Sequence, residues 1–99
     1  MPIRILVYGK PGDGAAYSAM GQLRSLIREM RVDASVQIIT DPQSLKDSGI
    51  DATPCVMVDG QMVSQGWVPS RNEITRAIQQ RQEQLNAHKQ PGGGGGTYL

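Results

Sequence analysis

The sequence predicts an α/β protein in which a four-stranded mixed sheet is flanked by helices, in the order β-α-β-α-β-β-α. Runs rich in branched apolar residues alternate with segments of helical periodicity, and an Asp-Gly pair separates the last two strand-like runs. The alternating part favours parallel pairing of the first two strands, whereas the Asp-Gly turn makes the last two antiparallel. A chain of 99 residues holds about one small domain.

The first half of the chain supplies two strands and two helices. Branched apolar residues over 3–8 predict a buried strand, and a second β-rich run covers 35–40. Between them, apolar residues at spacings of four and three predict one helical face formed by Ala16, Met20, Leu23, Ile27 and Met30. Asp13 is the expected N-cap of that helix, and Gly21 inside it is interpreted as a point of close packing. Asp41-Pro42 predicts a short helix that ends near Ser48.

The second half supplies a hairpin and a final helix. Strands are predicted over 55–58 and 61–65, on either side of the turn at Asp59-Gly60. Ser70 and Glu73 match a capping box, so the last helix begins there. Its apolar stripe thins toward the end and consists of Ile74, Ala77, Ile78 and Leu85. We expect the domain to cover residues 1–88 and a glycine-rich flexible tail to cover 89–99.

Composition narrows the classes of function. Ten Lys and Arg residues against nine Asp and Glu give a net charge of +1, and the basic residues are scattered, which argues against a nucleic-acid partner. No apolar run reaches the length of a membrane span, and a strand pattern begins at Ile3 without a signal peptide. We therefore expect no membrane association and a cytoplasmic location. One unpaired cysteine agrees with a reducing compartment, and a domain this small is stabilised if it binds a protein partner.

Several segments over residues 3 to 80 resemble the small thioredoxin and glutaredoxin-like proteins of bacteria and archaea, the branch of about eighty residues. The resemblance rests on Ile5-Leu6-Val7-Tyr8-Gly9 before a glycine-rich loop, on Gly49-Ile50-Asp51-Ala52-Thr53-Pro54, on Val56-Met57-Val58-Asp59-Gly60, and on Gly66 followed by Pro69-Ser70 and Glu73-Ile74. It implies a thioredoxin-like fold. It also implies that Thr53-Pro54 is the family's cis-proline corner, where the residue before proline offers its backbone to an extended substrate.

The chain departs from that family at the residues that carry its chemistry. Members have a C-x-x-C pair at the start of the first helix, where the helix dipole lowers the thiol pKa. The two positions fall here on Gly12 and Ala15 or, with a shift of one residue, on Asp13 and Ala16. Exchange between two thiols needs an attacking and a resolving thiol, and the sequence has one cysteine. We therefore expect a degenerate, redox-inactive site with no dithiol oxidoreductase activity and no cofactor.

Two alternatives use what remains at the degenerate site. The loop Gly9 to Gly14 has half of a phosphate-binding spacing, but Ala15-Ala16 stands where Lys and Ser or Thr would bind phosphate and magnesium. Capture of a small anion by the loop 10–15 stays open beside the simpler interpretation of a tight turn capped by Asp13. Cys55 is interpreted as a buried small hydrophobe, with monothiol exchange or soft-metal binding as its alternative.

Aromatic residues and the C-terminus suggest docking to a protein. Tyr17, near the vacated site, is interpreted as part of a docking surface or, equally, as an ordinary surface residue. Trp67 is interpreted as a packed edge residue or, alternatively, as an anchor for a partner. His88 is not assigned a catalytic role. Five glycines, which span at most about 17 Å when extended, precede Thr97, Tyr98 and Leu99. We expect a tether whose tip binds a partner, with an added linker as the alternative. The overall prediction is a noncatalytic subunit or adaptor of a larger protein assembly, such as a redox complex.

Overall fold

A computed structural model describes residues 2–89 and has the predicted order of elements. The strands are β1 (Ile3–Tyr8), β2 (Ala34–Ile39), β3 (Cys55–Val58) and β4 (Gln61–Gln65), and the helices are α1 (Gly14–Met30), α2 (Pro42–Ser48) and α3 (Arg71–Lys89). The strands form one sheet in the order β2-β1-β3-β4, in which β1 pairs parallel with β2 and antiparallel with β3, and β3 pairs antiparallel with β4. The mixed α/β architecture is as expected.

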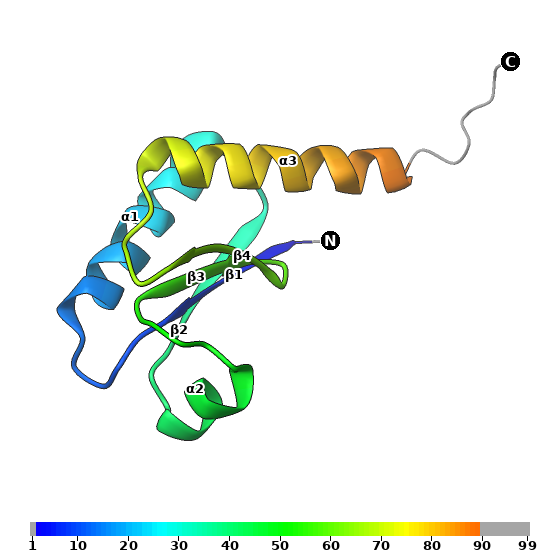
Figure 1. Cartoon of the computed structure of the whole chain (residues 1–99). Helices are drawn as coiled ribbons and strands as arrows, with labels where there is room; N and C mark the ends of the chain where they lie inside the picture. Colours follow the sequence, from blue (N-terminus) through cyan, green and yellow to red (C-terminus); the bar gives the residue numbers. More distant parts are fainter. Residues whose placement is uncertain (1, 90–99) are drawn as a thin grey trace, which may run out of the picture.

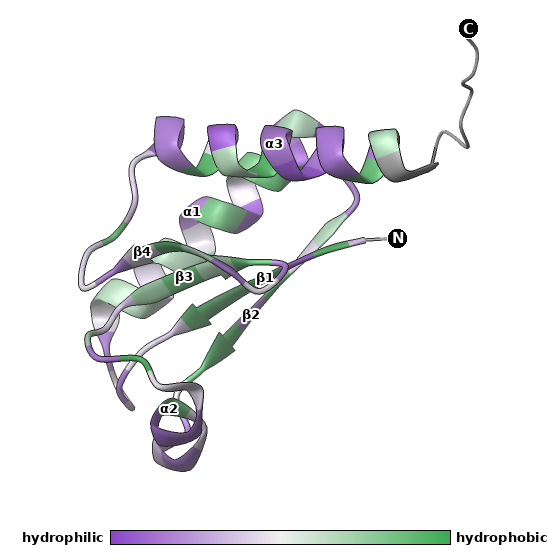
Figure 2. Ribbon diagram, turned by 45° about the vertical axis from the view of Figure 1, so that its right-hand side comes forward, coloured by the Kyte–Doolittle hydropathy of each residue, from purple (hydrophilic) through white to green (hydrophobic). Residues whose placement is uncertain are grey.

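The helices divide the two faces of the sheet unequally. Figure 1 shows α1 and α3 together over one face, whereas α2 lies beyond the carboxyl end of β2, on the side away from α3. The core lies between the sheet and the helices α1 and α3. Every second residue of β1, starting with Ile3, points toward these two helices and is buried. Its buried hydrophobic members are Ile3, Ile5, Val7, Ala16, Ala19, Leu23, Leu26, Val56, Val58, Ile74 and Ile78. In Figure 2 the green, apolar side of α3 accordingly faces the sheet.

Local signals account for the ends of the helices. The Asp13 carboxylate accepts a hydrogen bond from the Ala15 amide at 3.0 Å, and the Asp41 carboxylate caps α2 in the same way. Gly49 ends α2 in the left-handed region, as its position after Ser48 predicts. At α3 the expected capping box is present, because the Glu73 amide donates to Ser70 Oγ at 3.1 Å and the Ser70 amide donates to Glu73 Oε1 at 2.9 Å.

Three details differ from the sequence-based predictions. The buried face of α1 is shifted from the predicted one: Ala16 and Leu23 are buried as expected, but Ala19 and Leu26 are buried too, while Met20, Ile27 and Met30 are only partly buried. The second strand spans Ala34–Ile39, one residue earlier than predicted, because its pairing with β1 begins opposite Ile3. Gly21 is exposed, and a Cβ built there would meet no atom within 4 Å, so it is not a point of close packing.

Candidate functional site

Three connections meet at one end of the sheet and form the candidate site. The glycine-rich loop leaves β1 after Tyr8, which pairs with Cys55, the first residue of β3. Cys55 in turn pairs with Gln65, the last residue of β4. The loop that leads into α1, the Thr53-Pro54 corner and Trp67 therefore all lie at this end. Antiparallel pairing thus brings segments that are far apart in the sequence to the same end of the sheet.

The glycine-rich loop makes a tight turn into α1. The Asp13 amide donates to the Lys10 carbonyl at 2.9 Å, and Gly12 has a φ of 77°, in the left-handed region that favours glycine. Gly9 is buried against the first turn of α1, and a Cβ at this position would collide with the Cβ of Ala16. Because the Asp13 carboxylate already occupies the electropositive end of α1, this geometry does not favour capture of a second anion there.

The two candidate positions of the missing cysteine pair differ in their surroundings. Gly12 and Ala15 are both exposed, whereas Asp13 is half-buried and Ala16 is completely buried. Under either alignment the first position lies at the start of α1, where a thiol would be activated by the helix dipole. The residues at these positions have a carboxylate (Asp13), a methyl group (Ala15 and Ala16) or no side chain (Gly12), and none of these groups can attack a disulfide.

The Thr53-Pro54 corner presents a free backbone. The peptide bond between these residues is cis, Pro54 is buried, and its carbonyl accepts a hydrogen bond from the Gly66 amide at 2.8 Å. The Gln65 side chain accepts from the Asp51 amide at 2.9 Å and holds the preceding loop. Within residues 2–89, the half-buried Thr53 makes no hydrogen bond to another backbone group. Its amide and carbonyl can therefore pair with an extended segment from another molecule.

Cys55 lies beneath this corner and is not accessible. Its side chain is completely buried, and desolvation by burial raises the pKa of the thiol. Both properties disfavour the thiolate that exchange or metal binding requires. The structure thus agrees with a small buried hydrophobe and does not favour the monothiol alternative. Among residues 2–89, no group of three or more His, Cys, Asp or Glu side chains could hold a metal ion.

Two large aromatic side chains are exposed at the site. Trp67 is 50% exposed and Tyr17 is 48% exposed, so Trp67 is not the packed edge residue of the first interpretation. Exposed aromatic side chains are the kind of residue that anchors protein interfaces. Trp67 follows Gly66, whose amide is hydrogen-bonded to the Pro54 carbonyl, so Trp67 is attached to the chain next to the Thr53-Pro54 corner.

A groove that the sequence analysis missed is lined in part by Val68, the residue after Trp67. It has a volume of about 470 Å³ and lies between α1 and the segment from Val68 to Arg71. Its floor is apolar and includes Leu23 and Ile74, and one wall is formed by small and polar residues of α1: Ser18, Gly21, Gln22 and Ser25. The small residues Ser18, Gly21 and Ser25 recur at helical spacing and were the sequence signal for this groove. The sequence alone does not tell which other segment lies opposite them.

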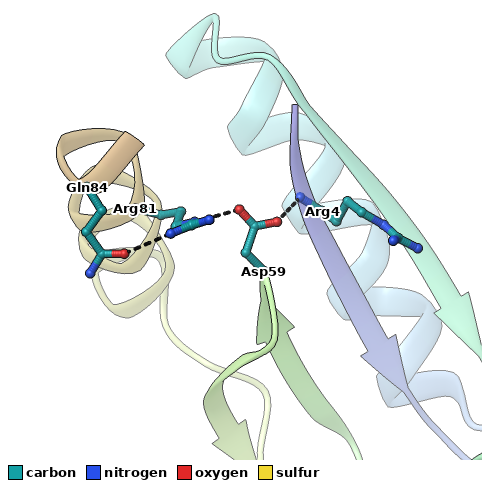
Figure 3. Close-up of polar contacts among 4 residues, drawn as sticks. All are labelled: Arg4, Asp59, Arg81 and Gln84. Atoms are coloured by element: carbon teal, nitrogen blue, oxygen red, sulfur yellow. Dashed lines mark hydrogen bonds and ion pairs between the residues drawn. The ribbon is translucent and has the colours of Figure 1, made fainter. Parts of the chain in front are cut away.

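Opposite the site, a polar cluster fastens the hairpin to the rest of the domain (Figure 3). The Asp59 carboxylate accepts from the Arg4 amide and from Arg81 Nε, both at 2.7 Å, and Arg81 also donates to Gln84 at 3.1 Å. Desolvation raises the pKa of Asp59, but the hydrogen bonds from Arg4 and Arg81 and their charges outweigh it and lower the pKa overall. One carboxylate thus connects β1, the β3-β4 turn and α3.

Several predicted residues lie outside the described part of the chain. Thr97, Tyr98 and Leu99, together with the rest of the glycine-rich segment, belong to residues 90–99, and the side chain of His88 is likewise not described. In residues 2–89, no helix combines the length and the apolar character that crossing a membrane requires.

Comparisons with known proteins agree with the fold. A family model described as a thioredoxin domain matches residues 15–79. A thioredoxin of Methanothermobacter thermautotrophicus is 28% identical over 78 residues, which cover 77% of this chain and 97% of the relative. A Staphylococcus aureus protein of unknown function has a similar structure, with a TM-score of 0.63, 15% identity and coverage of 83% of this chain and 93% of its own. A malarial protein has a TM-score of 0.62, 9% identity and coverage of 81% and 97%.

Proposed function

This chain belongs to the thioredoxin-domain family, and from that premise we propose that it is a noncatalytic member that acts as an adaptor or accessory subunit. It binds a protein partner at the end of the sheet where family members exchange thiols. The partner contributes an extended segment that pairs with the backbone of Thr53. Assembly in the cytoplasm is part of the proposal, because a lone cysteine suits a reducing compartment.

One observation supports the proposal: exposed aromatic side chains and an unpaired backbone lie at the site, although the sequence has no reactive cysteine pair there. Two aromatic side chains that are about half exposed, Tyr17 and Trp67, lie at the same end of the sheet as the unpaired Thr53 backbone. Gly12, Asp13, Ala15 and Ala16 provide no thiol there. Burying two aromatic side chains and pairing two backbone groups supplies affinity and register without chemistry.

The groove beside Trp67 extends this surface. A partner segment that leaves Thr53 passes Trp67 and reaches the apolar floor between α1 and Val68 to Arg71. Because Gly21 has no side chain and lies open on α1, a partner can approach the helix backbone closely at that point. We therefore expect an apolar side chain of the partner to enter this groove.

The C-terminal segment is a second element of the proposal. Pro91 and five glycines precede Thr97, Tyr98 and Leu99, so an aromatic and an aliphatic side chain follow a tether without side chains. A tether that binds the same partner raises the effective concentration of the first contact, and the combined affinity exceeds that of either contact alone.

Affinity purification at the native expression level tests the proposal. Trp67→Ser and Tyr17→Ser should each reduce the amount of the captured partner strongly, because they remove exposed aromatic anchors. Met62→Ser is the matched control, since Met62 is 47% exposed on β4 but lies away from the site. Deletion of residues 91–99 should weaken capture, and Cys55→Ser should not change it.

Two results would contradict the proposal. If Cys55→Ser abolishes partner capture while Trp67→Ser and the tail deletion have no effect, the adaptor role is wrong. Disulfide reduction by the purified protein in an insulin assay would also contradict it, because a noncatalytic adaptor performs no thiol exchange.

A further inference from the structure

The outer strand β2 has a free edge at which further backbone pairing is possible. It ends the sheet on one side, with β1 as its only neighbour among the described strands, and Figure 2 shows it at the border of the sheet. This edge is separated by β1 and β3 from β4, which leads to Trp67. Contacts along β2 are therefore independent of the proposed docking site.

Hydrogen bonds to β1 decide which groups of β2 remain unpaired. The Ile3 amide donates to the Asp33 carbonyl at 2.9 Å, and the Gly9 amide donates to the Ile39 carbonyl at 3.0 Å. Odd-numbered residues of β2 thus direct their backbone groups toward β1, because these groups alternate along a strand. The amides and carbonyls of Ala34, Val36 and Ile38 consequently point away from the sheet.

This edge lacks three features by which proteins protect an outer strand, namely charged residues, a proline and a bulge. β2 has the sequence ASVQII and contains neither a charged residue nor a proline. Val36 and Ile38 pack against the core but are only half-buried, so apolar surface remains for a neighbour. The other outer strand, β4, pairs with β3 through a register shift between Val56 and Met57 that leaves Val63 of β4 as an extra residue, and an irregularity of this kind discourages further pairing.

We propose that two copies of this chain pair through their β2 strands, antiparallel, to form a symmetric dimer with a continuous eight-stranded sheet. The two-fold axis passes beside Val36, so that Val36 lies opposite Val36 of the second copy and Ala34 lies opposite Ile38. On the open face, Ser35 then lies opposite Gln37 of the second copy. Every contact except the Val36 pair on the axis occurs twice, and both free β2 edges are paired, which closes the assembly at two copies.

Charges at the ends of β2 select this register. With the axis beside Val36, the exposed Arg31, which ends α1 just before β2, lies at the same end of the paired strands as the exposed Asp41 of the second copy, so opposite charges come near each other. A shift that centres the pairing on Gln37 would instead place Asp33 opposite Asp41 and repel the two copies. A second copy is therefore a better occupant than an arbitrary extended peptide, because its edge is complementary in both backbone and charge.

Sedimentation equilibrium of the full chain under reducing conditions tests the proposal. The expected result is a monomer–dimer equilibrium in which amides of Ala34, Val36 and Ile38 become protected from hydrogen exchange as the dimer forms. A protein that stays monomeric up to millimolar concentration would overturn the proposal, and so would a mass that grows beyond the dimer. Exchange measured on the unmodified chain does not depend on how any variant folds.

A pair of double variants tests the register. Ser35 and Gln37 are both exposed on the open face, so S35K/Q37K and S35K/Q37E leave the core of the monomer intact. S35K/Q37K places two lysines opposite each other at two places and should raise the dimer dissociation constant at least about tenfold. S35K/Q37E instead forms two opposite-charge pairs and should keep the dissociation constant near that of the unmodified chain. Equal affinity of the two variants would refute pairing through β2 in this register.

Discussion

Replacing Asp59 by Asn should destabilise the protein by an amount that depends on pH. Asn is nearly the same size as Asp and tolerates the φ of 47° at this position, so the turn itself is preserved. It keeps an oxygen for the Arg4 amide but loses the negative charge that accepts from Arg81 Nε. The variant therefore isolates the charged contact between the β3-β4 turn and α3.

The size of the effect follows from how far this ion pair is removed from water. The side chains of Asp59 and Arg81 are 14% and 32% exposed, respectively. A hydrogen bond to a charged group contributes roughly 1.5–3 kcal/mol, and partial exposure places this one near the lower end, at about 1.5 kcal/mol. For a domain of this length that corresponds to a melting temperature lower by about 6–12 °C.

Thermal unfolding followed by circular dichroism measures the difference at several pH values. Because the folded pKa of Asp59 is lowered, its stabilising contribution is complete above the unfolded value of about 3.9 and is lost as the pH falls through the folded value. The difference in melting temperature between wild type and D59N should thus be largest near neutral pH and should become smaller toward about pH 3.

Glu29→Gln is the matched control. Arg71 and Glu29 form an ion pair of similar length, 2.8 Å, but their side chains are 63% and 56% exposed, so its loss should leave the melting temperature almost unchanged. The reasoning would be refuted if D59N and E29Q had equal effects, or if the D59N gap were the same in acid as at neutral pH.

Three further substitutions and one reactivity measurement test the packing and the site. In chemical unfolding, Gly9→Ala should lower the free energy of unfolding by about 1–3 kcal/mol, because the added Cβ collides with Ala16. Gly21→Ala lies in open space on α1 and should raise the free energy of unfolding by about 0.5–1 kcal/mol. Changes of the opposite sign would contradict the packing described. Native Cys55 should react with a thiol reagent far more slowly than in the unfolded chain, because it is buried with a raised pKa; equal rates would indicate an accessible thiol. Ser70→Ala should cost about 1 kcal/mol by removing the cap of α3, and an unchanged free energy of unfolding would show that the cap is dispensable.

The elements that sequence reasoning predicted well are those with local signals. Asp13 and Asp41 cap their helices, and the Asp59-Gly60 turn joins β3 to β4, because each signal acts within a few residues of itself. The same holds for the family, whose resemblance rests on short segments and whose model matches residues 15–79. The missing thiol pair is likewise plain from the single cysteine in the sequence.

Predictions that required knowledge of packing were less accurate. Periodicity finds a helical face but does not fix its centre, so Ala19 and Leu26 are fully buried on α1, whereas Met20 and Met30 are only partly buried. For the same reason, the half exposure of Trp67 could not be predicted from its neighbours. The groove beside it is formed by α1 and by a loop that follows β4, and it exists only after folding.

The order of the elements, the caps and turns that bound them, and the loss of the reactive pair were all evident in the sequence, because they depend on nearby residues or on residue identity. Folding in three dimensions was needed to establish which side chains are exposed at the end of the sheet, that Cys55 is buried, and that β2 keeps an open edge. Those properties depend on contacts between segments distant in the chain, and sequence periodicity carries no information about which segments meet.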